Sequence, residues 1–413
     1  MKKALNCFIL IFLIILCTGC NSEQEDVLKI CVDAQLEPAV RELVDTWKQL
    51  NGEMKTELIV IPSDASTAEI KIQKLRTEIM SGSGPDVFIL QCAHPNAAEE
   101  QQVLFSNPEK MMYSEVFLPL DEYMEQAQYM DTDSWNQKIL QSGRTEEGQL
   151  LLPLFYEYYA CALEKNSSDL TENLPSSWDE FLTCESVPLM QAVRSQIGIG
   201  YYTIFSQLAD YKNETMLLSE EELLEQTEKT ILYAEKAWET GDKSDNIMSG
   251  QIGDSFFTYL SENKQEEHQI LAFPNVEGGL TAHVTMYAGI NRNTEYPEKA
   301  FSLLDCLFSD EIMCETGFSV KDRWFGSRVI PLCMAKGISI NDKAVQKKCG
   351  TWNEEDQNAF WTMNDRVSTV CYYSDWDREL QDMYGMCRAT ENTEERRKII
   401  VQMLDRLQMK LVE

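Results

Sequence analysis

Blocks of apolar and polar residues alternate through the first third of the chain, and their spacing changes from strand-like to helix-like and back. Short apolar runs of strand length lie at 27–32, 55–61 and 87–90. Between them, apolar residues recur at helical spacing over 40–50 and 68–79. Ser66 and Glu69 have the spacing of a capping box at the start of the second helix. Strands that alternate with helices predict a parallel α/β sheet, in which ligands bind beyond the carboxyl ends of the strands.

Helical patterns dominate the rest of the chain. Helices are predicted at 219–238, 297–308 and 395–411, residues 177–182 are predicted to open another helix, and strands are predicted at 269–273 and 284–290. The 413 residues are 44% hydrophobic, which is enough for a globular body, and their number favours two domains. The sequence shows no repeat, low-complexity tract or second hydrophobic span after its first segment.

That first segment, residues 1–20, has the pattern of an export signal. An apolar run of about a dozen residues follows two lysines and is too short to span a bilayer, which takes roughly 20. Small residues precede Cys20, and a polar, acidic tract at 21–26 follows it as a tether. The tripeptide that ends at Cys20 resembles a lipobox, although Cys17 stands where that motif usually has leucine. This implies that Cys20 is lipidated and anchors the exported protein to the outer face of the cell membrane.

Charge narrows the range of partners. The chain has 68 acidic and 36 basic residues, a formal net charge of −32, and loss of Lys2 and Lys3 with the signal makes the mature protein more negative. Such a surface repels nucleic acid and anionic lipid headgroups, so no nucleic-acid partner is expected. It also provides no field that gathers anions, which favours a neutral or cationic ligand.

Cysteine and histidine usage argues against a disulfide scaffold and a metal centre. Thirteen cysteines are too few for a disulfide scaffold in a chain of this length. Seven lie among apolar neighbours and are predicted to be buried free thiols: Cys31, Cys92, Cys161, Cys184, Cys306, Cys371 and Cys387. So many free thiols in an exported protein indicate a reducing habitat. The three histidines lack metal-ligand spacing, so neither a metal nor a cofactor is expected.

Seven segments together resemble a known family in their order along the chain. They are S-G-S-G-P-D-V-F (81–88), F-L-P-L-D-E-Y (117–123), G-Q-L-L-L-P-L-F-Y-E-Y-Y (148–159), L-P-S-S-W-D-E-F (174–181), L-A-F-P-N-V-E-G-G (271–279), Y-P-E-K-A-F-S-L-L-D-C-L-F-S-D-E (296–311) and G-S-R-V-I-P (326–331). Each is weak alone. Behind a lipoprotein signal, the set resembles the extracellular solute-binding proteins of the carbohydrate-type family, to which maltose-binding protein belongs.

The resemblance implies a two-lobed, type II periplasmic-binding-protein-like α/β fold, in which each lobe is a mainly parallel sheet flanked by helices. The lobes are predicted at 27–150 with 284–330, and at 151–283 with 331–413. A small molecule, expected to be a sugar or oligosaccharide, is buried in the cleft between them. Hinge closure then lets the permease subunits of an ABC transporter recognise the loaded protein. We expect a monomer with no catalytic role.

A sugar presents apolar C–H faces and a rim of hydroxyls, so its site needs aromatic plates and fixed hydrogen-bonding groups. The predicted ligand-binding residues are Gln91, Tyr156, Glu157, Tyr158, Asp254, Ser255, Tyr287 and Trp324. Tyr156 and Tyr158 share one face of an extended segment and Glu157 lies on the other, so part of this cluster is expected to pack in the core.

Family resemblance supplies the positions of the other candidates. Gln91 follows a strand end where family members often place ligand contacts. Asp254 and Ser255 lie in a stretch that loosely resembles a contact helix. Tyr287 lies in the strand that returns to the first lobe, and Trp324 precedes the G-S-R-V-I-P segment. Core packing, or an indole that fixes a loop, is the competing interpretation for the aromatic residues.

Other functions stay open at this point. Adjacent tyrosines occur at 158–159, 201–202 and 372–373, and such pairs hold ferric iron in related binding folds, although adjacent side chains point apart and so favour packing. Polyamines, other small cations and sugar phosphates are further ligands within the family. A glycan-acting enzyme needs only two carboxylates, but the sequence has no nucleophile elbow, phosphate-binding loop or zinc motif.

Overall fold

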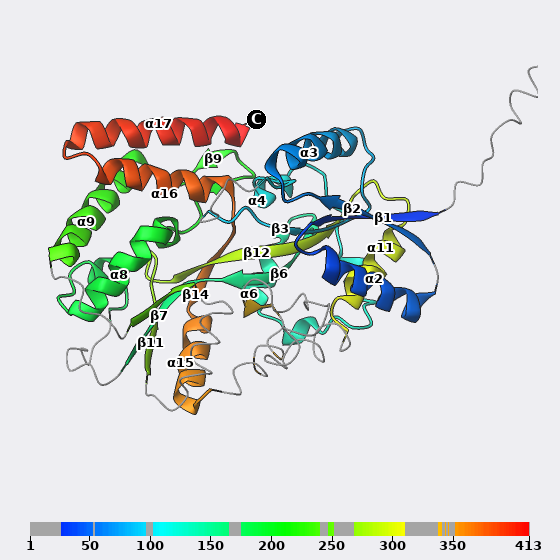
Figure 1. Ribbon diagram of the computed structural model, residues 1–413, viewed down its shortest axis with the longest axis horizontal. Coiled ribbons are helices and arrows are strands. Elements are labelled where there is room, and N and C mark those ends of the chain that lie inside the picture. The colour runs from blue at the N-terminus through cyan, green and yellow to red at the C-terminus, as the bar shows by residue number, and fades with distance from the viewer. Residues whose placement is uncertain are drawn as a thin grey trace, which may run out of the picture.

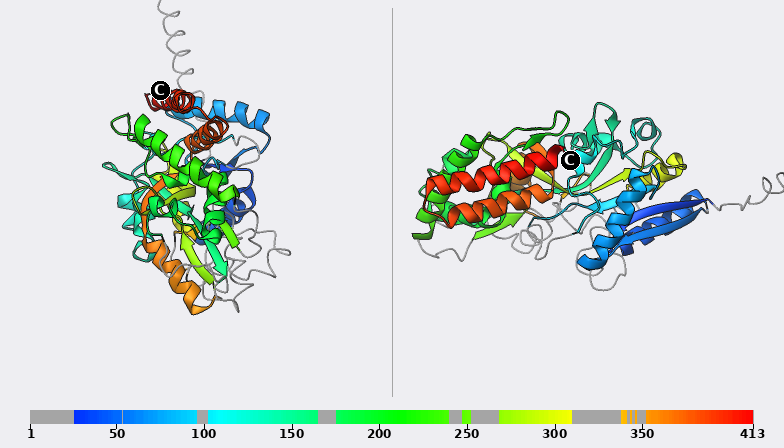
Figure 2. Two further views of the ribbon diagram at one scale, coloured as in Figure 1. Left: turned by 90° about the vertical axis from the view of Figure 1, so that its left-hand side faces the viewer. Right: turned by 90° about the horizontal axis from the view of Figure 1, so that it is seen from above.

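The chain folds into two lobes at opposite ends of the molecule, joined by long strands (Figure 1). This computed structural model describes residues 26–52, 54–95, 102–164, 175–239, 247–251, 268–309, 338–340, 343, 346 and 352–412. The view from above shows the same division, with the amino-terminal elements at one end and most of the green and red helices at the other (Figure 2, right).

The first lobe is built around the amino-terminal strands. Its main elements are β1 (Val27–Asp33), α2 (Glu37–Asn51), β2 (Lys55–Ile61), α3 (Ala65–Met80), β3 (Val87–Gln91) and α11 (Pro297–Cys306). β1 lies between β2 and β3 and is parallel to both, with Ile30 opposite Leu58 on one side and Val87 on the other. The parallel α/β pattern predicted for the first third of the chain is therefore confirmed.

Two strands cross between the lobes (Figure 1). β6 (Leu151–Glu157) and β12 (Leu280–Ile290) are antiparallel neighbours, and both are buried along their whole length. β12 pairs with β3 through its last residues and with β14 (Val367–Tyr372) through its first. The result is a mixed seven-stranded sheet of order β13-β6-β12-β3-β1-β2, with β14 beside β12. The exact lobe boundaries stay a prediction.

The second lobe contains a sheet of a different kind. It has three strands: β7 (Tyr159–Glu164), β10 (Ile247–Gln251) and β11 (His268–Ala272). β10 and β11 flank β7, and both run antiparallel to it. The first residue of each pairs with a residue at the end of β7. This sheet differs from the mainly parallel one predicted for each lobe. The helices between β7 and β10 return the chain to the end of the sheet at which β7 finishes.

Helices form most of the second lobe. They are α7 (Trp178–Phe181), α8 (Val187–Gly200), η2 (Tyr201–Ile204), α9 (Glu220–Glu239), α15 (Glu354–Asp365), α16 (Asp375–Arg388) and α17 (Thr393–Val412). α17 packs on α16 and α9 (Figure 1). Ion pairs support this layer, with Lys410 Nζ 2.6 Å from Asp375 Oδ2 and Arg406 Nε 3.1 Å from Glu379 Oε2.

The remaining elements are short. They are α4 (Pro108–Met111), α5 (Asp121–Met124), η1 (Thr132–Ser134), α6 (Gln137–Gln141), β4 (Arg144–Thr145), β5 (Gly148–Gln149), β8 (Ala209–Asp210), β9 (Thr215–Met216) and β13 (Ile338–Ser339). Trp178, the first residue of α7, is completely buried in the core of the second lobe.

Local sequence explains how the chain turns from α3 into β3. The helix begins two residues earlier than predicted, because Asp64 and not Ser66 is its cap: Asp64 Oδ1 accepts a hydrogen bond of 3.0 Å from the Thr67 amide. After the helix, Gly82 and Gly84 adopt φ angles of 79° and 105°, which glycine adopts without steric cost. These two glycines let the chain reverse into the strand that ends at the lobe junction.

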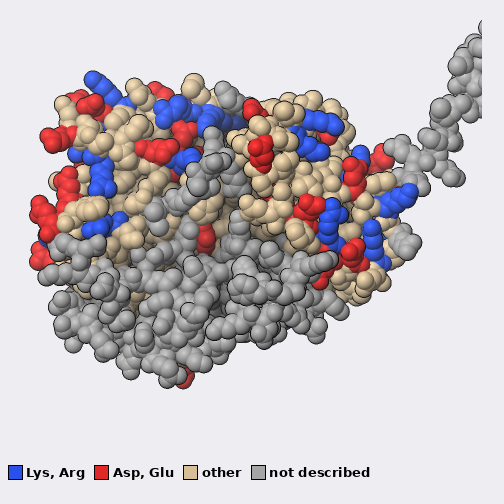
Figure 3. Space-filling view, viewed as in Figure 1, with Lys and Arg blue, Asp and Glu red and all other residues tan. Residues whose placement is uncertain are grey.

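Acidic and basic side chains are mixed on the described part of one face, over both lobes (Figure 3). The net negative charge therefore does not form a field of one sign there. None of the helices in the described segments is long and apolar enough to cross a membrane. Cys31, Cys92, Cys161, Cys184, Cys371 and Cys387 are free thiols, as predicted; Cys184 and Cys371 are half-buried, and the others, like Cys306, are buried.

Candidate functional site

Several segments meet between the two lobes. The first lobe contributes the loop after β3. The second lobe contributes the start of β7, η2 and the residue after β14. The crossing strands contribute the end of β6 and the first half of β12. We name the side chains that meet there the junction cluster: His94, Glu157, Tyr159, Tyr202, His283 and Tyr373.

A polar contact between the lobes forms the accessible edge of this cluster. His94 Nε2 lies 3.2 Å from Glu157 Oε1, within hydrogen-bonding distance. The His94 side chain is 31% exposed and that of Glu157 is 8% exposed. The His94 imidazole is therefore partly accessible to solvent, and the Glu157 carboxylate beside it is nearly buried.

Stacked rings form the interior of the cluster. The Tyr373 ring stacks on His283 with centroids 4.7 Å apart and planes at 15°. His94 approaches the same tyrosine at 4.9 Å, and Tyr202 meets His283 edge-on at 5.5 Å. Because His94 comes from the first lobe and Tyr202 from the second, Tyr373 lies between aromatic groups of both lobes. Rings held in this way are rigid and need little further ordering to contact a ligand.

Two phenols of the cluster, those of Tyr202 and Tyr373, have raised pKa values. Tyr159 Oη and Tyr202 Oη lie 3.4 Å apart. Burial raises the pKa of Tyr202 and of Tyr373 well above the usual 10, and the charge of Glu157 raises both further. Ferric iron binds phenolate oxygens, so this environment favours hydrogen bonding and packing over iron ligation. Among the described residues, no group of three or more His, Cys, Asp or Glu side chains is arranged to hold a metal ion.

Two further carboxyl groups lie near the cluster. Asp377 Oδ1 lies 3.7 Å from His283 Nε2, and its other oxygen accepts the Ser374 amide at 2.8 Å, which caps α16. Glu109 Oε2 accepts the Tyr372 amide at 3.3 Å. Burial raises the pKa of Glu109 to about 8, against the effect of that hydrogen bond and with a smaller contribution from Asp377.

Around Glu109, a second set of contacts joins α4 and its flanks to the second lobe. Asn107 Nδ2 donates to Tyr211 Oη at 3.1 Å. Lys110 Nζ donates to the Lys410 carbonyl at 2.6 Å. The Asp375 amide donates to the carbonyl of Ser106 at 3.3 Å. We name this set the α4 seam, and it fixes how the loop after β3 sits against α16 and α17.

The predicted site residues separate into two groups in the described part of the chain. Glu157 belongs to the junction cluster. Gln91 lies three residues before His94 of that cluster, and the backbone N–H of Gln91 donates to Asp33 Oδ2 at 2.7 Å. Tyr156 is buried and donates through Oη to Asn364 Oδ1 at 2.7 Å. Tyr158 and Tyr287 are buried as well, and neither belongs to the cluster. Whether any of them contacts ligand stays a prediction.

The other predicted positions lie outside the described residues. They are Cys20, Asp254, Ser255 and Trp324. Their roles in lipidation and in ligand binding therefore stay predictions.

Tyr159, Tyr202, His283 and Tyr373 were not among the predicted site residues, although the sequence contains a signal for three of them. Each of the three adjacent tyrosine pairs sends its second member into the cluster. The first members point elsewhere: Tyr201 stacks on Tyr384 at 4.3 Å, and Tyr372 meets Tyr287 at 5.7 Å. The expectation that adjacent tyrosines point apart is confirmed for these two pairs.

Comparisons with known proteins agree with this architecture. Residues 33–313 match the family described as bacterial extracellular solute-binding protein. A search of curated proteins finds no match. Among solved structures, the chain is similar to a family 1 extracellular solute-binding protein from Alicyclobacillus acidocaldarius, with 12% identity, a TM-score of 0.56, and 95% of this chain and 100% of that chain covered.

Two other solved structures have similar scores. The sugar-binding protein MalE from Xanthomonas citri has 11% identity, a TM-score of 0.60, and coverage of 93% of this chain and 98% of that one. A periplasmic oligogalacturonide-binding protein from Yersinia enterocolitica has 15% identity, a TM-score of 0.57, and coverage of 94% and 100%. Likeness at such low identity shows the fold, and it confirms the predicted two-lobed, type II periplasmic-binding-protein-like architecture.

Proposed function

This chain belongs to the family of bacterial extracellular solute-binding proteins, and from that premise we propose that it captures a sugar or oligosaccharide between its lobes and delivers it to the permease of an ABC transporter. The observation that carries the proposal is the junction cluster. It places three tyrosines, two histidines and a carboxylate where both lobes meet.

The chemistry of the cluster suits a sugar. Flat rings provide surfaces for the C–H faces of a sugar. The Glu157 carboxylate accepts hydrogen bonds from hydroxyl groups, and the ring nitrogens of His94 can donate or accept them. A neutral sugar gains little from net charge, so most of its affinity must come from contacts of this kind. The cluster is buried apart from His94, and opening of the lobes is the proposed route by which a solute reaches it.

The ligands named for similar proteins support a carbohydrate. One neighbour is a sugar-binding protein, one binds an oligogalacturonide and a third was solved with α-D-tagatose. The two ligands that are named, an oligogalacturonide and α-D-tagatose, differ in size, so they support the class of solute rather than one member of it.

A thermal-shift screen tests the proposal. The panel contains neutral mono- and oligosaccharides, uronic acid oligomers, sugar phosphates and polyamines. A ligand at 100 times its dissociation constant stabilises the folded protein by about 2.7 kcal/mol, which a melting curve resolves. We expect a neutral sugar to give the largest increase in melting temperature. A response confined to polyamines or to sugar phosphates would contradict the carbohydrate assignment.

We also propose that the protein binds oligosaccharides without cleaving them. Incubation with the best ligand of the screen, followed by a reducing-end assay, separates the two possibilities. A binder returns the oligosaccharide intact, whereas release of new reducing ends in proportion to protein concentration would show a glycan-acting enzyme.

Anchoring through a lipid on Cys20 is a further part of the proposal. The Cys20→Ala precursor has no thiol for thioether formation and is expected to leave the detergent phase in a phase-partitioning experiment. If the variant partitions into detergent as the wild type does, an uncleaved signal anchor becomes the better explanation. We expect the mature protein to act as a monomer on the outer face of the membrane.

A further inference from the structure

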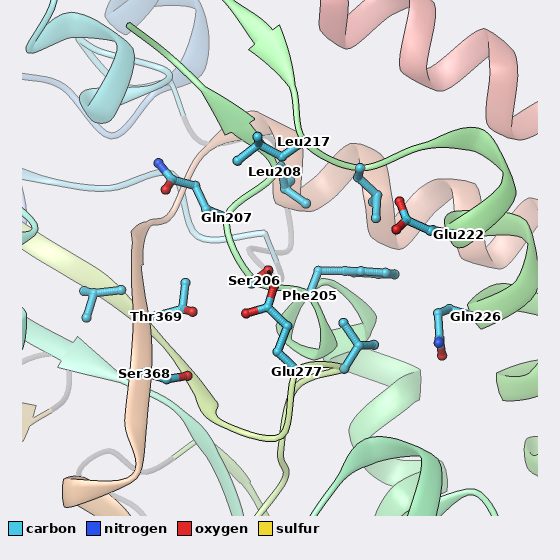
Figure 4. Close-up of a pocket in the computed structure, with 13 residues that line it drawn as sticks. Phe205, Ser206, Gln207, Leu208, Leu217, Glu222, Gln226, Glu277, Ser368 and Thr369 are labelled. Carbon is cyan, nitrogen blue, oxygen red and sulfur yellow. Dashed lines mark hydrogen bonds between the residues drawn. The ribbon is translucent and has the colours of Figure 1, made fainter. Parts of the chain in front are cut away.

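A separate cavity lies within the second lobe, at a distance along β14 from the junction cluster. It has a volume of about 730 Å³ and is lined by residues after η2, by the two residues after β9, by the start of α9, by the turn between β11 and β12, and by β14. Figure 4 shows Ser368 and Thr369 of β14 on one side and Glu222 and Gln226 of α9 on the other, with Phe205 and Glu277 between them. We name this cavity the α9 pocket.

The size and lining of the α9 pocket suit a small polar molecule. Sites for small ligands enclose about 300–1,000 Å³ and combine apolar walls with a few fixed polar groups. Phe205 and five leucine and valine neighbours provide the apolar part. Serine, threonine and glutamine side chains provide hydrogen-bonding groups on facing sides.

The charge of the lining is of one sign. The lining residues include Glu222 and Glu277 but no lysine, arginine or histidine. Glu222 accepts hydrogen bonds from the amide and hydroxyl of Ser219, at 3.1 and 2.6 Å, and these lower the pKa of its carboxyl group. Glu277 Oε1 accepts a hydrogen bond of 2.7 Å from the Ser206 hydroxyl. Both acceptors are thus held in place, and neither is paired with a cationic side chain of the pocket.

One group in the wall needs a donor. Gln226 Oε1 is buried and has no hydrogen-bond partner among the described residues. A buried acceptor without a donor costs free energy, so a ligand that brings an N–H or O–H group there is favoured. This observation is independent of the two carboxylates and points to the same kind of ligand, one that donates.

From this geometry we infer that the α9 pocket is a second solute site, which binds a small molecule carrying a protonated amine and hydrogen-bonding groups. The ammonium group pairs with Glu277 or Glu222 at the rim and donates to the pocket wall, while the carbon skeleton lies against Phe205 and its apolar neighbours. All of these groups belong to one lobe. Binding there is therefore expected without closure of the lobes and independently of the junction cluster.

The test uses the mature protein with glucosamine as the amine probe and N-acetylglucosamine as its uncharged counterpart, measured by calorimetry and ligand-observed NMR. Putrescine is a second amine that lacks a sugar ring. We expect both amines to bind, N-acetylglucosamine not to bind at the pocket, and affinity for the amines to fall as salt is raised. The Glu222→Gln, Glu277→Gln double variant should weaken amine binding at least about tenfold. Glutamine at 222 preserves the capping pattern with Ser219.

Two control variants make the result decisive. Glu57→Gln removes one charge from an exposed side chain of β2 in the first lobe and should leave amine affinity unchanged. Glu157→Gln alters the junction cluster and should also leave it unchanged. Loss of amine binding in Glu157→Gln, with retention in the double variant, would show that amines enter the junction and would overturn the inference. Absence of amine binding to the wild type would overturn it as well, and neither result bears on sugar capture at the junction.

Discussion

The junction cluster and the α9 pocket are built in opposite ways. The cluster is assembled from both lobes and is buried, with only His94 substantially exposed, whereas the pocket belongs to one lobe and carries its two carboxylates on exposed side chains. Aromatic stacking dominates the first and charge dominates the second. The geometry of the junction cluster therefore depends on the relative position of the lobes, and that of the α9 pocket does not. A hinge motion would separate the residues of the cluster and leave those of the pocket in place.

The largest expected difference between the two regions is in stability. Tyr373→Ala removes a ring that is 1% exposed and packs between two histidines and Tyr202, so it should lower the free energy of unfolding by about 3–5 kcal/mol. Leu217→Ala truncates a pocket residue that is 55% exposed and should change it by less than about 0.5 kcal/mol. Urea denaturation of both variants measures their free energies of unfolding. An equal loss of stability in the two variants would contradict the expected difference between the regions.

Affinity for the proposed sugar should separate the regions next. Glu157→Gln keeps the shape of the side chain but removes the charge that strengthens its hydrogen bonds, and it should weaken sugar binding by about tenfold to a hundredfold. Glu277→Gln in the α9 pocket should not change sugar affinity. Calorimetry with the best ligand from the screen provides both values. A reversed pattern would place the sugar in the pocket.

An indole outside the described residues sharpens the same contrast. If Trp324 stacks on the sugar, Trp324→Ala should raise the dissociation constant about thirtyfold, or roughly 2 kcal/mol, while the melting temperature of the empty protein stays nearly constant. Trp178→Ala is the matched structural control, because Trp178 is fully buried and should affect melting rather than affinity. A lower melting temperature with unchanged affinity in Trp324→Ala would assign that residue to the core.

A pH dependence of stability is expected at the α4 seam. The folded protein raises the pKa of Glu109 from 4.5 to about 8, so between these values it retains a proton that the unfolded chain releases. Stability should therefore fall as pH rises from about 5 to 8, by on the order of 1 kcal/mol per pH unit, and level off above 8. Glu109→Gln has no such proton, so its stability should fall less across this range than that of the wild type. Glu122→Gln, an exposed control, should follow the wild type, and equal slopes in all three proteins would contradict the burial of an ionisable Glu109.

Sequence patterns identified the elements better than their pairing. The strand at Lys55–Ile61 has the predicted bounds, and the closing helix was predicted to within two residues at its start, since apolar spacing is a local property. The antiparallel order of β10, β7 and β11 was not predicted, because it depends on where distant helices return the chain. β12 begins at Leu280, four residues before the predicted strand, where pairing with β14 extends it.

For the candidate site too, local sequence features could be predicted and long-range pairing could not. Glu157 could be predicted because it follows a recognisable crossover motif. His283 and Tyr373 could not, because they reach the cluster through pairing of β12 with β6 and β14, which joins residues far apart in the sequence. The tyrosine pairs were noticed, but which member of each pair turns inward is decided by the register of the strands and of η2.

Small-angle scattering of the mature protein, with and without its best sugar ligand, tests the central claim most directly. If the solute binds between the lobes and the hinge closes on it, the radius of gyration must fall when the ligand is bound at saturation, in the wild type and equally in Glu277→Gln. An unchanged scattering profile at proven saturation would contradict capture at the junction, and would place the ligand in a rigid pocket within one lobe.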